Sequence, residues 1–97
     1  MMLDMFSMLL CLYCAPKETL ELYPLLSSEN DIGTRINQGI IYCNSCKRFY
    51  MIKDEILYLS LDKLREKEDE LSFLQEYKSD LPEKIIFEAK PYNLVDY

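Results

Sequence analysis

The sequence predicts a small α+β domain: an antiparallel sheet of about four strands with an N-terminal helix and C-terminal helices. Two Cys-x-x-Cys motifs, Cys11–Cys14 and Cys43–Cys46, indicate a metal staple of the kind that small domains commonly need. Short apolar stretches of strand character surround these motifs over residues 1–59, and leucines at helical spacing follow over residues 60–97. The 97 residues are therefore expected to form a single domain with these two parts.

The four cysteines give the strongest chemical signal in the chain. They are its only cysteines, and the chain has no histidine, so a site with four nitrogen or sulfur ligands must be all-sulfur. Two such motifs separated by residues 15–42 are typical of a zinc ribbon, in which two tight turns hold one tetrahedral ion. The sequence therefore predicts a zinc-ribbon-like core over residues 1–59. The expected ligands of its structural zinc are Cys11, Cys14, Cys43 and Cys46.

The size of the chain makes such a metal important for folding. A structural zinc contributes about 10–16 kcal/mol of apparent binding free energy, whereas a whole domain is stable by only about 5–15 kcal/mol. Two disulfides are the alternative for four cysteines, but the paired two-residue gaps and the lack of a secretion signal favour a metal. The same four thiolates could also hold iron, as in a rubredoxin-like electron-transfer protein.

The turn in each motif is expected to contain a residue with positive φ. Glycine often follows the second cysteine because the backbone there adopts a positive φ. In this chain Ala15 and Lys47 occupy the two positions. A residue with a side chain in that conformation costs about 1–2 kcal/mol, which is small beside the contribution of the metal.

Charge and composition exclude several function classes. The formal net charge is −6, and an acidic chain does not attract nucleic-acid phosphate, so direct nucleic-acid binding is not expected. A nucleic-acid-binding zinc ribbon stays as an alternative hypothesis. The apolar stretch 1–10 lacks a preceding basic region and is too short to span a membrane, so we expect a cytoplasmic protein.

The N-terminal half predicts a helix followed by strands. Met1–Leu10 is apolar around most of a helical circumference, so this helix must be buried in the chain or against a partner. Thr19–Tyr23 alternates apolar and polar residues, and Pro24 should end this strand or mark a sheet edge. The polar stretch Ser27–Gly33 is expected to be a loop. Ile36–Tyr42 is expected to be the second strand.

The next segment predicts a hairpin. Gly39 is expected to form a bulge or turn within the second strand, and Phe49–Ile52 is expected to be the third strand. Lys53–Glu55 should be a tight connection. Ile56–Leu59, the fourth strand, is apolar without alternation, which is typical of a strand covered on both faces.

The C-terminal part predicts two helices and a tail. A helix is expected from an N-cap at Ser60 to about Ser79, with the charged run Glu66–Glu70 facing solvent. Asp80–Glu83 has the pattern of a capping box and should open a short helix from Pro82 to about Glu88. Pro91–Leu94 is expected to be an extended tail.

Catalysis is not expected. The chain has no histidine for acid–base chemistry, and a tetrathiolate site leaves no open position for water or substrate. Its two glycines, Gly33 and Gly39, do not form a phosphate-binding loop.

The order of these motifs resembles one family of proteins over nearly the whole chain. The apolar helix and first Cys-x-x-Cys are followed by a Leu-Glu-Leu strand, a polar loop and the stretch Gly39-Ile-Ile-Tyr-Cys-x-x-Cys-Lys-Arg-Phe-Tyr-Met-Ile52. This is similar to the zinc-binding methyltransferase-activator subunits of the Trm-one-one-two-like family, whose second motif is typically followed by Arg, two aromatic residues and Ile. The matching residues are Arg48, Phe49, Tyr50 and Ile52.

Two further features bear on this resemblance. Leu81–Ile85 and Lys90–Leu94 resemble the C-terminal extension of archaeal members. The chain departs from the family where Asp54-Glu55-Ile56-Leu57 replaces the usual Asp/Asn-Gly-Ile-Pro, and where Leu12 and Asn44 replace a proline often found inside each motif.

The resemblance implies a function without catalysis. Family members activate and stabilise S-adenosylmethionine-dependent class I methyltransferases that modify tRNA, rRNA or a translation release factor. They form heterodimers with these enzymes by adding a strand to the enzyme's sheet and covering an apolar patch. If this chain binds a partner in the same way, six residues are expected to contact it: Phe6, Met8, Ile40, Tyr42, Phe49 and Met51.

Overall fold

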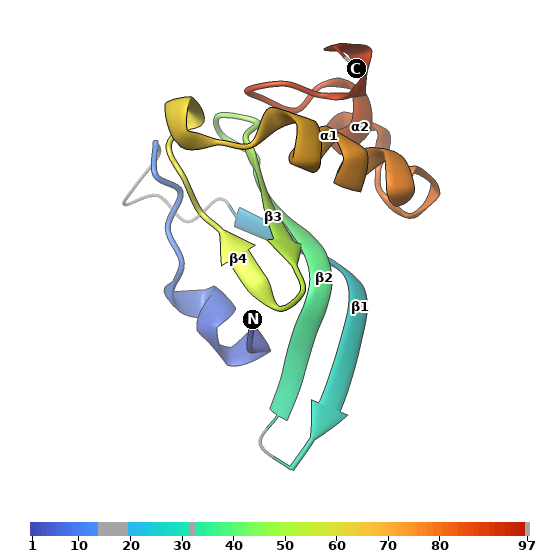
Figure 1. The fold of residues 1–97 in the computed structure, drawn as a ribbon. Coiled ribbons are helices and arrows are strands. Elements are labelled where there is room, and N and C mark those ends of the chain that lie inside the picture. Colours follow the sequence, from blue (N-terminus) through green and yellow to red (C-terminus); the bar gives the residue numbers. More distant parts are fainter. Residues whose placement is uncertain (14–19, 32, 97) are drawn as a thin grey trace.

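The structure, a computed structural model, describes residues 1–13, 20–31 and 33–96. It has the predicted α+β fold, a four-stranded antiparallel sheet in the order β1-β2-β3-β4 flanked by short helices (Figure 1). The strands are β1 (Leu20–Asn30), β2 (Gly33–Cys43), β3 (Phe49–Lys53) and β4 (Ile56–Tyr58). The α-helices are α1 (Lys67–Glu76) and α2 (Glu83–Phe87), and the 3-10 helices are η1 (Leu3–Met8), η2 (Asp62–Leu64), η3 (Lys78–Asp80) and η4 (Leu94–Asp96). No helix in the described part of the chain is long and apolar enough to cross a membrane.

The sheet separates two hydrophobic cores, because successive side chains of a strand point to opposite faces. In β3, Phe49 and Met51 face α1 and α2, whereas Tyr50 and Ile52 face the N-terminal segment. The core on the helical face also contains Ile40, Tyr42, Leu71, Phe73, Leu74, Leu81, Ile85, Ile86 and Ala89. The core on the other face also contains Cys11, Ile36, Ile41 and Cys43.

An irregularity in β2 places Ile36 and Ile41 in the same core. Leu26 pairs with Gln38 and Ser27 with Ile36, so Asn37 is an extra residue that reverses the alternation of side chains. The irregularity predicted at Gly39 is present beside it, because Leu25 is an extra residue of β1 between the Gly39 and Gln38 pairs, and the extra Asn37 in β2 is a second one. A side chain at position 39 would be crowded, because a Cβ there would lie 3.1 Å from the backbone oxygen of Tyr23.

The predicted loop over Ser27–Gly33 is wrong for its first four residues. Residues 27–30 continue β1 and pair with the start of β2, and the Asn30 side chain accepts a hydrogen bond from the Gly33 N–H at 3.2 Å. This part of the hairpin extends away from the rest of the sheet, as Figure 1 shows. Its side chains are exposed, so a polar sequence there is compatible with a strand. Pro24 lies in an edge strand, as predicted.

The β3–β4 turn is tight and strained. Its two central residues, Asp54 (φ 51°) and Glu55 (φ 72°), both have positive φ without being glycine. Contacts from β2 hold them: Glu55 N–H donates to the Asn37 oxygen at 2.9 Å, and the Gln38 amide donates to Asp54 at 2.9 Å. The strained turn is therefore fixed by the neighbouring strand.

Strand β4 is an edge strand and is not covered on both faces within this chain. Ile56 is 56% exposed and Tyr58 is 38% exposed. The expected cover for residues 56–59 is therefore incomplete in the described structure, and this edge of the sheet presents apolar side chains to solvent.

The long helix predicted from Ser60 to Ser79 is broken. Its first turn is η2, Arg65 is extended (φ −80°, ψ 150°), and α1 begins only at Lys67. Neither helix has a side-chain cap, so the expected N-cap at Ser60 does not form. Leu64, which lies within the predicted helix, is 65% exposed.

A buried ion pair explains the break. The extended backbone at Arg65 directs its guanidinium inward, where it lies 2.7 Å from the Glu70 carboxylate with side-chain exposures of 1% and 3%. Arg65 also donates to the Phe49 carbonyl oxygen, and the Tyr92 hydroxyl donates to Glu70 at 3.0 Å. The expectation that the whole run 66–70 faces solvent is therefore wrong at Glu70.

The C-terminal helix is close to its predicted place. The sequence predicts Pro82 to about Glu88, and α2 covers Glu83–Phe87 with Pro82 as its N-cap residue. The capping box expected at Asp80 does not form, because no side chain caps this helix.

We predict that Glu70→Gln lowers the free energy of unfolding by about 3–5 kcal/mol, because it leaves the buried guanidinium of Arg65 without a counter-charge. Urea titration monitored by far-UV circular dichroism measures this change. Glu68→Gln, an exposed carboxylate on the same helix, is the control and should change stability by less than about 0.5 kcal/mol. Equal effects of the two substitutions would contradict the assigned role of the ion pair.

Candidate metal centre

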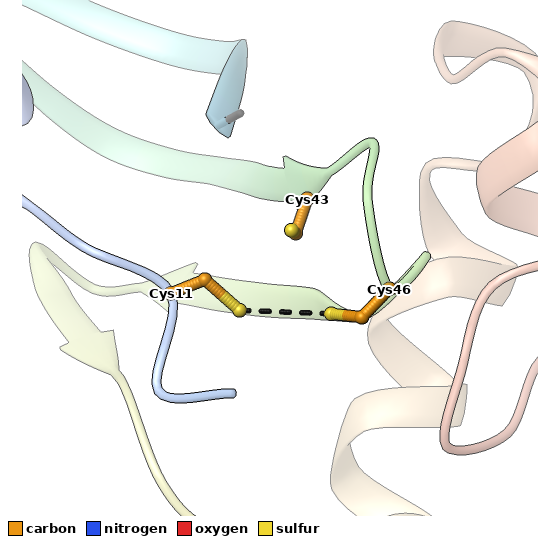
Figure 2. A group of neighbouring side chains, drawn as sticks. All are labelled: Cys11, Cys43 and Cys46. Carbon is orange, nitrogen blue, oxygen red and sulfur yellow. Dashed lines mark hydrogen bonds between the residues drawn. The ribbon is translucent and has the colours of Figure 1, made fainter. Parts of the chain in front are cut away.

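Three cysteines that are distant in sequence meet at one end of the sheet. Cys11 follows the N-terminal segment, Cys43 ends β2, and Cys46 lies in the turn that leads to β3. Their sulfur atoms all lie within 4.8 Å of one another, and Figure 2 shows the three side chains directed toward a common point. These sulfurs are close enough to hold a metal ion.

The sulfur positions fit a metal better than a disulfide. The Cys11 and Cys46 sulfurs are 3.6 Å apart, whereas a disulfide bond is about 2.05 Å long. Tetrahedral ligation with bonds of about 2.3 Å places neighbouring sulfurs about 3.8 Å apart. The cluster therefore supplies three corners of such a tetrahedron. The predicted fourth ligand, Cys14, lies outside the described residues.

The turn between β2 and β3 sets the direction of two of these sulfurs. Lys47 N–H donates to the Cys43 oxygen at 2.8 Å, and Cys43 N–H donates to the Arg48 oxygen at 2.8 Å. Closing this turn requires a positive φ at Lys47, which is 66°. The predicted backbone conformation after the second motif is confirmed there. The corresponding position in the first motif, Ala15, is outside the described residues.

The environment of the cluster is largely apolar. Cys11 and Cys43 are fully buried, and Cys46 is partly exposed. Burial raises the pKa of the Cys46 thiol to about 12, although hydrogen bonds from Arg48 act in the opposite direction. A thiol with this pKa is protonated at neutral pH, so a metal ion must displace its proton on binding.

Tyr50 extends the cluster on its buried side. Its hydroxyl oxygen lies 3.4 Å from the Cys11 sulfur, and the whole side chain is buried. Burial is the main cause of the raised pKa of this hydroxyl, and the contact with Cys11 adds to it. The sequence suggested no such role for Tyr50. Only its position in β3, on the face of the sheet that Cys11 packs against, could have indicated it.

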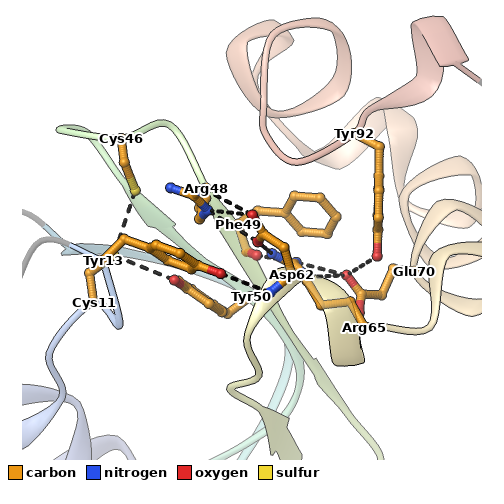
Figure 3. A network of polar contacts seen from close by, with 10 residues as sticks. All are labelled: Cys11, Tyr13, Cys46, Arg48, Phe49, Tyr50, Asp62, Arg65, Glu70 and Tyr92. Atoms are coloured by element: carbon orange, nitrogen blue, oxygen red, sulfur yellow. Dashed lines mark hydrogen bonds and ion pairs between the residues drawn. The ribbon is translucent and has the colours of Figure 1, made fainter.

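Arg48 links the cluster to two other segments (Figure 3). Its guanidinium forms an ion pair with Asp62 at 2.9 Å and lies over the Tyr13 ring, 3.5 Å from the ring centre. Asp62 N–H in turn donates to the Tyr13 hydroxyl oxygen at 2.9 Å. The ion pair lowers the pKa of Asp62 and raises that of Arg48. Arg48, the second residue after the second motif, therefore joins the first motif to η2.

Four of the six residues predicted to contact a partner are buried within this chain. Ile40, Tyr42, Phe49 and Met51 pack against the C-terminal helices, so a partner would reach them only if these helices moved. Phe6 is partly buried against the opposite core. Met8 lies at the end of η1, and its side chain is not described.

No family model, curated protein or solved structure matches this chain. The interpretation of the cluster therefore depends on its geometry and on the chemistry of its residues.

We predict that Lys47→Gly raises the free energy of unfolding by up to about 1 kcal/mol. Glycine relieves a strain of about 1–2 kcal/mol but loses about 0.5–1 kcal/mol through the greater freedom of the unfolded chain. Thermal and urea unfolding of the substituted protein measure the balance. Ser45→Gly, an exposed position of the same turn without positive φ, should instead lower stability. A loss of stability at both positions would contradict a strained turn.

Proposed function

We propose that this chain is a non-catalytic subunit that binds and stabilises S-adenosylmethionine-dependent methyltransferases acting on tRNA, rRNA or a translation release factor. Its cysteine cluster would hold a structural zinc. The observation that carries the proposal is an exposed apolar surface beside the free edge of β4. Three further features support it: the acidic charge, the cluster of three cysteine sulfurs that could hold a metal ion, and the resemblance of the sequence to methyltransferase activators.

The exposed apolar side chains lie on two segments that contact each other at both ends. Tyr58 of β4 pairs with Met51 and faces the helical side of the sheet, whereas residues 1–13 pack against the other face. The Met1 nitrogen is 2.6 Å from the Glu55 oxygen, and the Tyr13 hydroxyl oxygen is 2.9 Å from the Asp62 nitrogen. These contacts tether residues 1–13 along residues 55–62. We call the exposed apolar side chains of these two segments, with the adjoining Leu64, the apolar flank: Leu3, Met5, Leu10, Leu12, Tyr13, Ile56, Tyr58, Leu61 and Leu64.

The edge of β4 gives this surface a way of binding. Among the described residues, β4 pairs only with β3, so the backbone groups of its other edge are available to a further strand. Strand addition uses main-chain hydrogen bonds for affinity and alternate side chains for specificity. Ile56 and Tyr58 are such alternate residues, and each is exposed. A sheet-containing enzyme with a free edge strand is a suitable partner.

The metal would support this surface and would not contact a substrate. An all-cysteine site leaves no position for substrate, so zinc would fix the backbone that supports the sheet. The net charge of −6 disfavours direct contact with RNA, and the RNA would be bound by the partner enzyme. The proposed roles of the two parts are therefore separate.

We predict that the purified chain contains one zinc per molecule and that Cys43→Ser removes it. The substitution should also unfold the sheet region, because structural zinc contributes an amount comparable to the stability of a whole domain. Mass spectrometry of the native protein gives the metal content, and far-UV circular dichroism with and without a chelator gives the folding. An unchanged spectrum after complete metal removal would contradict a structural role. A red, redox-active protein would favour iron.

The partner hypothesis predicts that the tagged chain, expressed in its own host, retains a class I methyltransferase in stoichiometric amount. Ile56→Asp should weaken this complex by about thirtyfold, because it places a charge at the centre of the proposed interface. Leu26→Asp is the control: Leu26 is equally exposed (53%) but lies on β1, at the opposite edge of the sheet.

Three readouts test the complex: identification of the retained protein, its dissociation constant for each variant, and methyl transfer from labelled S-adenosylmethionine. Absence of any methyltransferase among the retained proteins would contradict the proposed function. Equal weakening by Ile56→Asp and Leu26→Asp would contradict the proposed surface.

A further inference from the structure

The hydroxyl of Tyr50 occupies an unusual position for a buried polar group. The side chain extends from the middle of β3 into the core that contains Cys11, Cys43 and Ile41, and it is fully buried. Buried hydroxyls almost always have a hydrogen-bond partner. Among the residues that the structure describes, the partner of this hydroxyl is the Cys11 sulfur, 3.4 Å away. The fold therefore satisfies Tyr50 with a sulfur atom of the candidate metal centre.

Metal binding fixes the direction of this hydrogen bond. Between a free thiol and a hydroxyl, either group can donate the proton. A metal-bound cysteine is a thiolate and has no proton, so Tyr50 must then be the donor. We propose that Tyr50 is a positioning residue that donates a hydrogen bond to the Cys11 thiolate and lowers the electron density on its sulfur. This inference depends on the metal-binding part of the proposed function.

The negative charge of the metal centre explains why a hydrogen bond to one of its thiolates would be stabilising. Thiolates gathered in a buried site carry more negative charge than one divalent ion neutralises, and outer donors reduce the excess. Arg48, two residues before Tyr50 in the chain, is a second donor. A hydrogen bond from its guanidinium to the Cys46 sulfur opposes the rise in the pKa of that thiol. Cys46 is the partly exposed ligand, whereas Cys11 is reached only from the interior. The segment that enters β3 therefore supplies one donor on the exposed side of the cluster and one on its buried side.

A thiolate with lower electron density donates less negative charge to the metal. The bond from Tyr50 therefore changes the metal–sulfur bond of Cys11 while the metal is bound. Removal of the hydroxyl should leave the number of bound metal ions unchanged, because Tyr50 is not a ligand. It should change the electronic properties of the metal–sulfur bond, which a purely structural role would not change.

The test compares Tyr50→Phe with the unchanged protein after each is loaded with Co²⁺, whose sulfur-to-metal charge-transfer bands report on thiolate electron density. The bands should move to lower energy, because a sulfur without its hydrogen bond gives up an electron more easily.

The matched control is Tyr92→Phe. It also removes a tyrosine hydroxyl, in this case one that is 3.0 Å from Glu70, on the helical side of the sheet. Its cobalt bands should equal those of the unchanged protein. Bands for Tyr50→Phe that match this control would overturn the proposal.

A second measurement needs no substitution, so it holds even if Tyr50→Phe fails to fold. In the unchanged protein loaded with ¹¹³Cd, a proton that bridges the Tyr50 oxygen and the Cys11 sulfur should show scalar coupling to the metal by NMR. Bound cadmium without this coupling would overturn the role of Tyr50 but leave the metal site intact. Failure of the unchanged protein to bind Co²⁺ or Cd²⁺ would overturn the metal site and this inference together.

Discussion

The turn between β2 and β3 is the constraint on which the rest of the structure depends. It reverses the chain within a few residues, and Lys47 must adopt a positive φ for the turn to close. The same turn binds the C-terminal tail: Lys90 N–H donates to the Lys47 oxygen at 2.8 Å, and Phe49 N–H donates to the Lys90 oxygen at 3.1 Å. The tail and the sheet are therefore held by the backbone of one short segment.

Side chains of this turn extend the connection to the other face of the sheet. Cys43 and Cys46 meet Cys11 there, and Arg48 joins Tyr13 to the start of η2. A metal bound by these sulfurs would therefore fix the N-terminal segment, the turn and the helical extension relative to one another. The two hydrophobic cores lie on opposite faces, but they share this corner of the molecule.

Sequence reasoning succeeded where the determining interactions are local. Paired cysteines, strand alternation and the positive φ at Lys47 follow from residues close together in the chain. It failed where a distant contact decides the conformation. Arg65 interrupts a helical pattern in order to reach Glu70 and the Phe49 carbonyl oxygen, and no local pattern reveals that Glu70 is buried. The bulge at Asn37 likewise depends on pairing with β1, which local propensity does not encode.

The burial of Ile40, Tyr42, Phe49 and Met51 locates the open surface of the molecule. An alternating apolar strand shows that a face must be covered, but not whether the cover comes from the same chain. Here α1 and α2 provide that cover, and the Arg65–Glu70 pair fixes the start of α1 against β3. Exposed apolar groups remain at the β4 edge, where Tyr58 is on the helical side, and along residues 1–13, which pack against the opposite face. Such exposed apolar groups are costly for a free monomer, and the proposed partner would cover those at the β4 edge by adding a strand to the sheet.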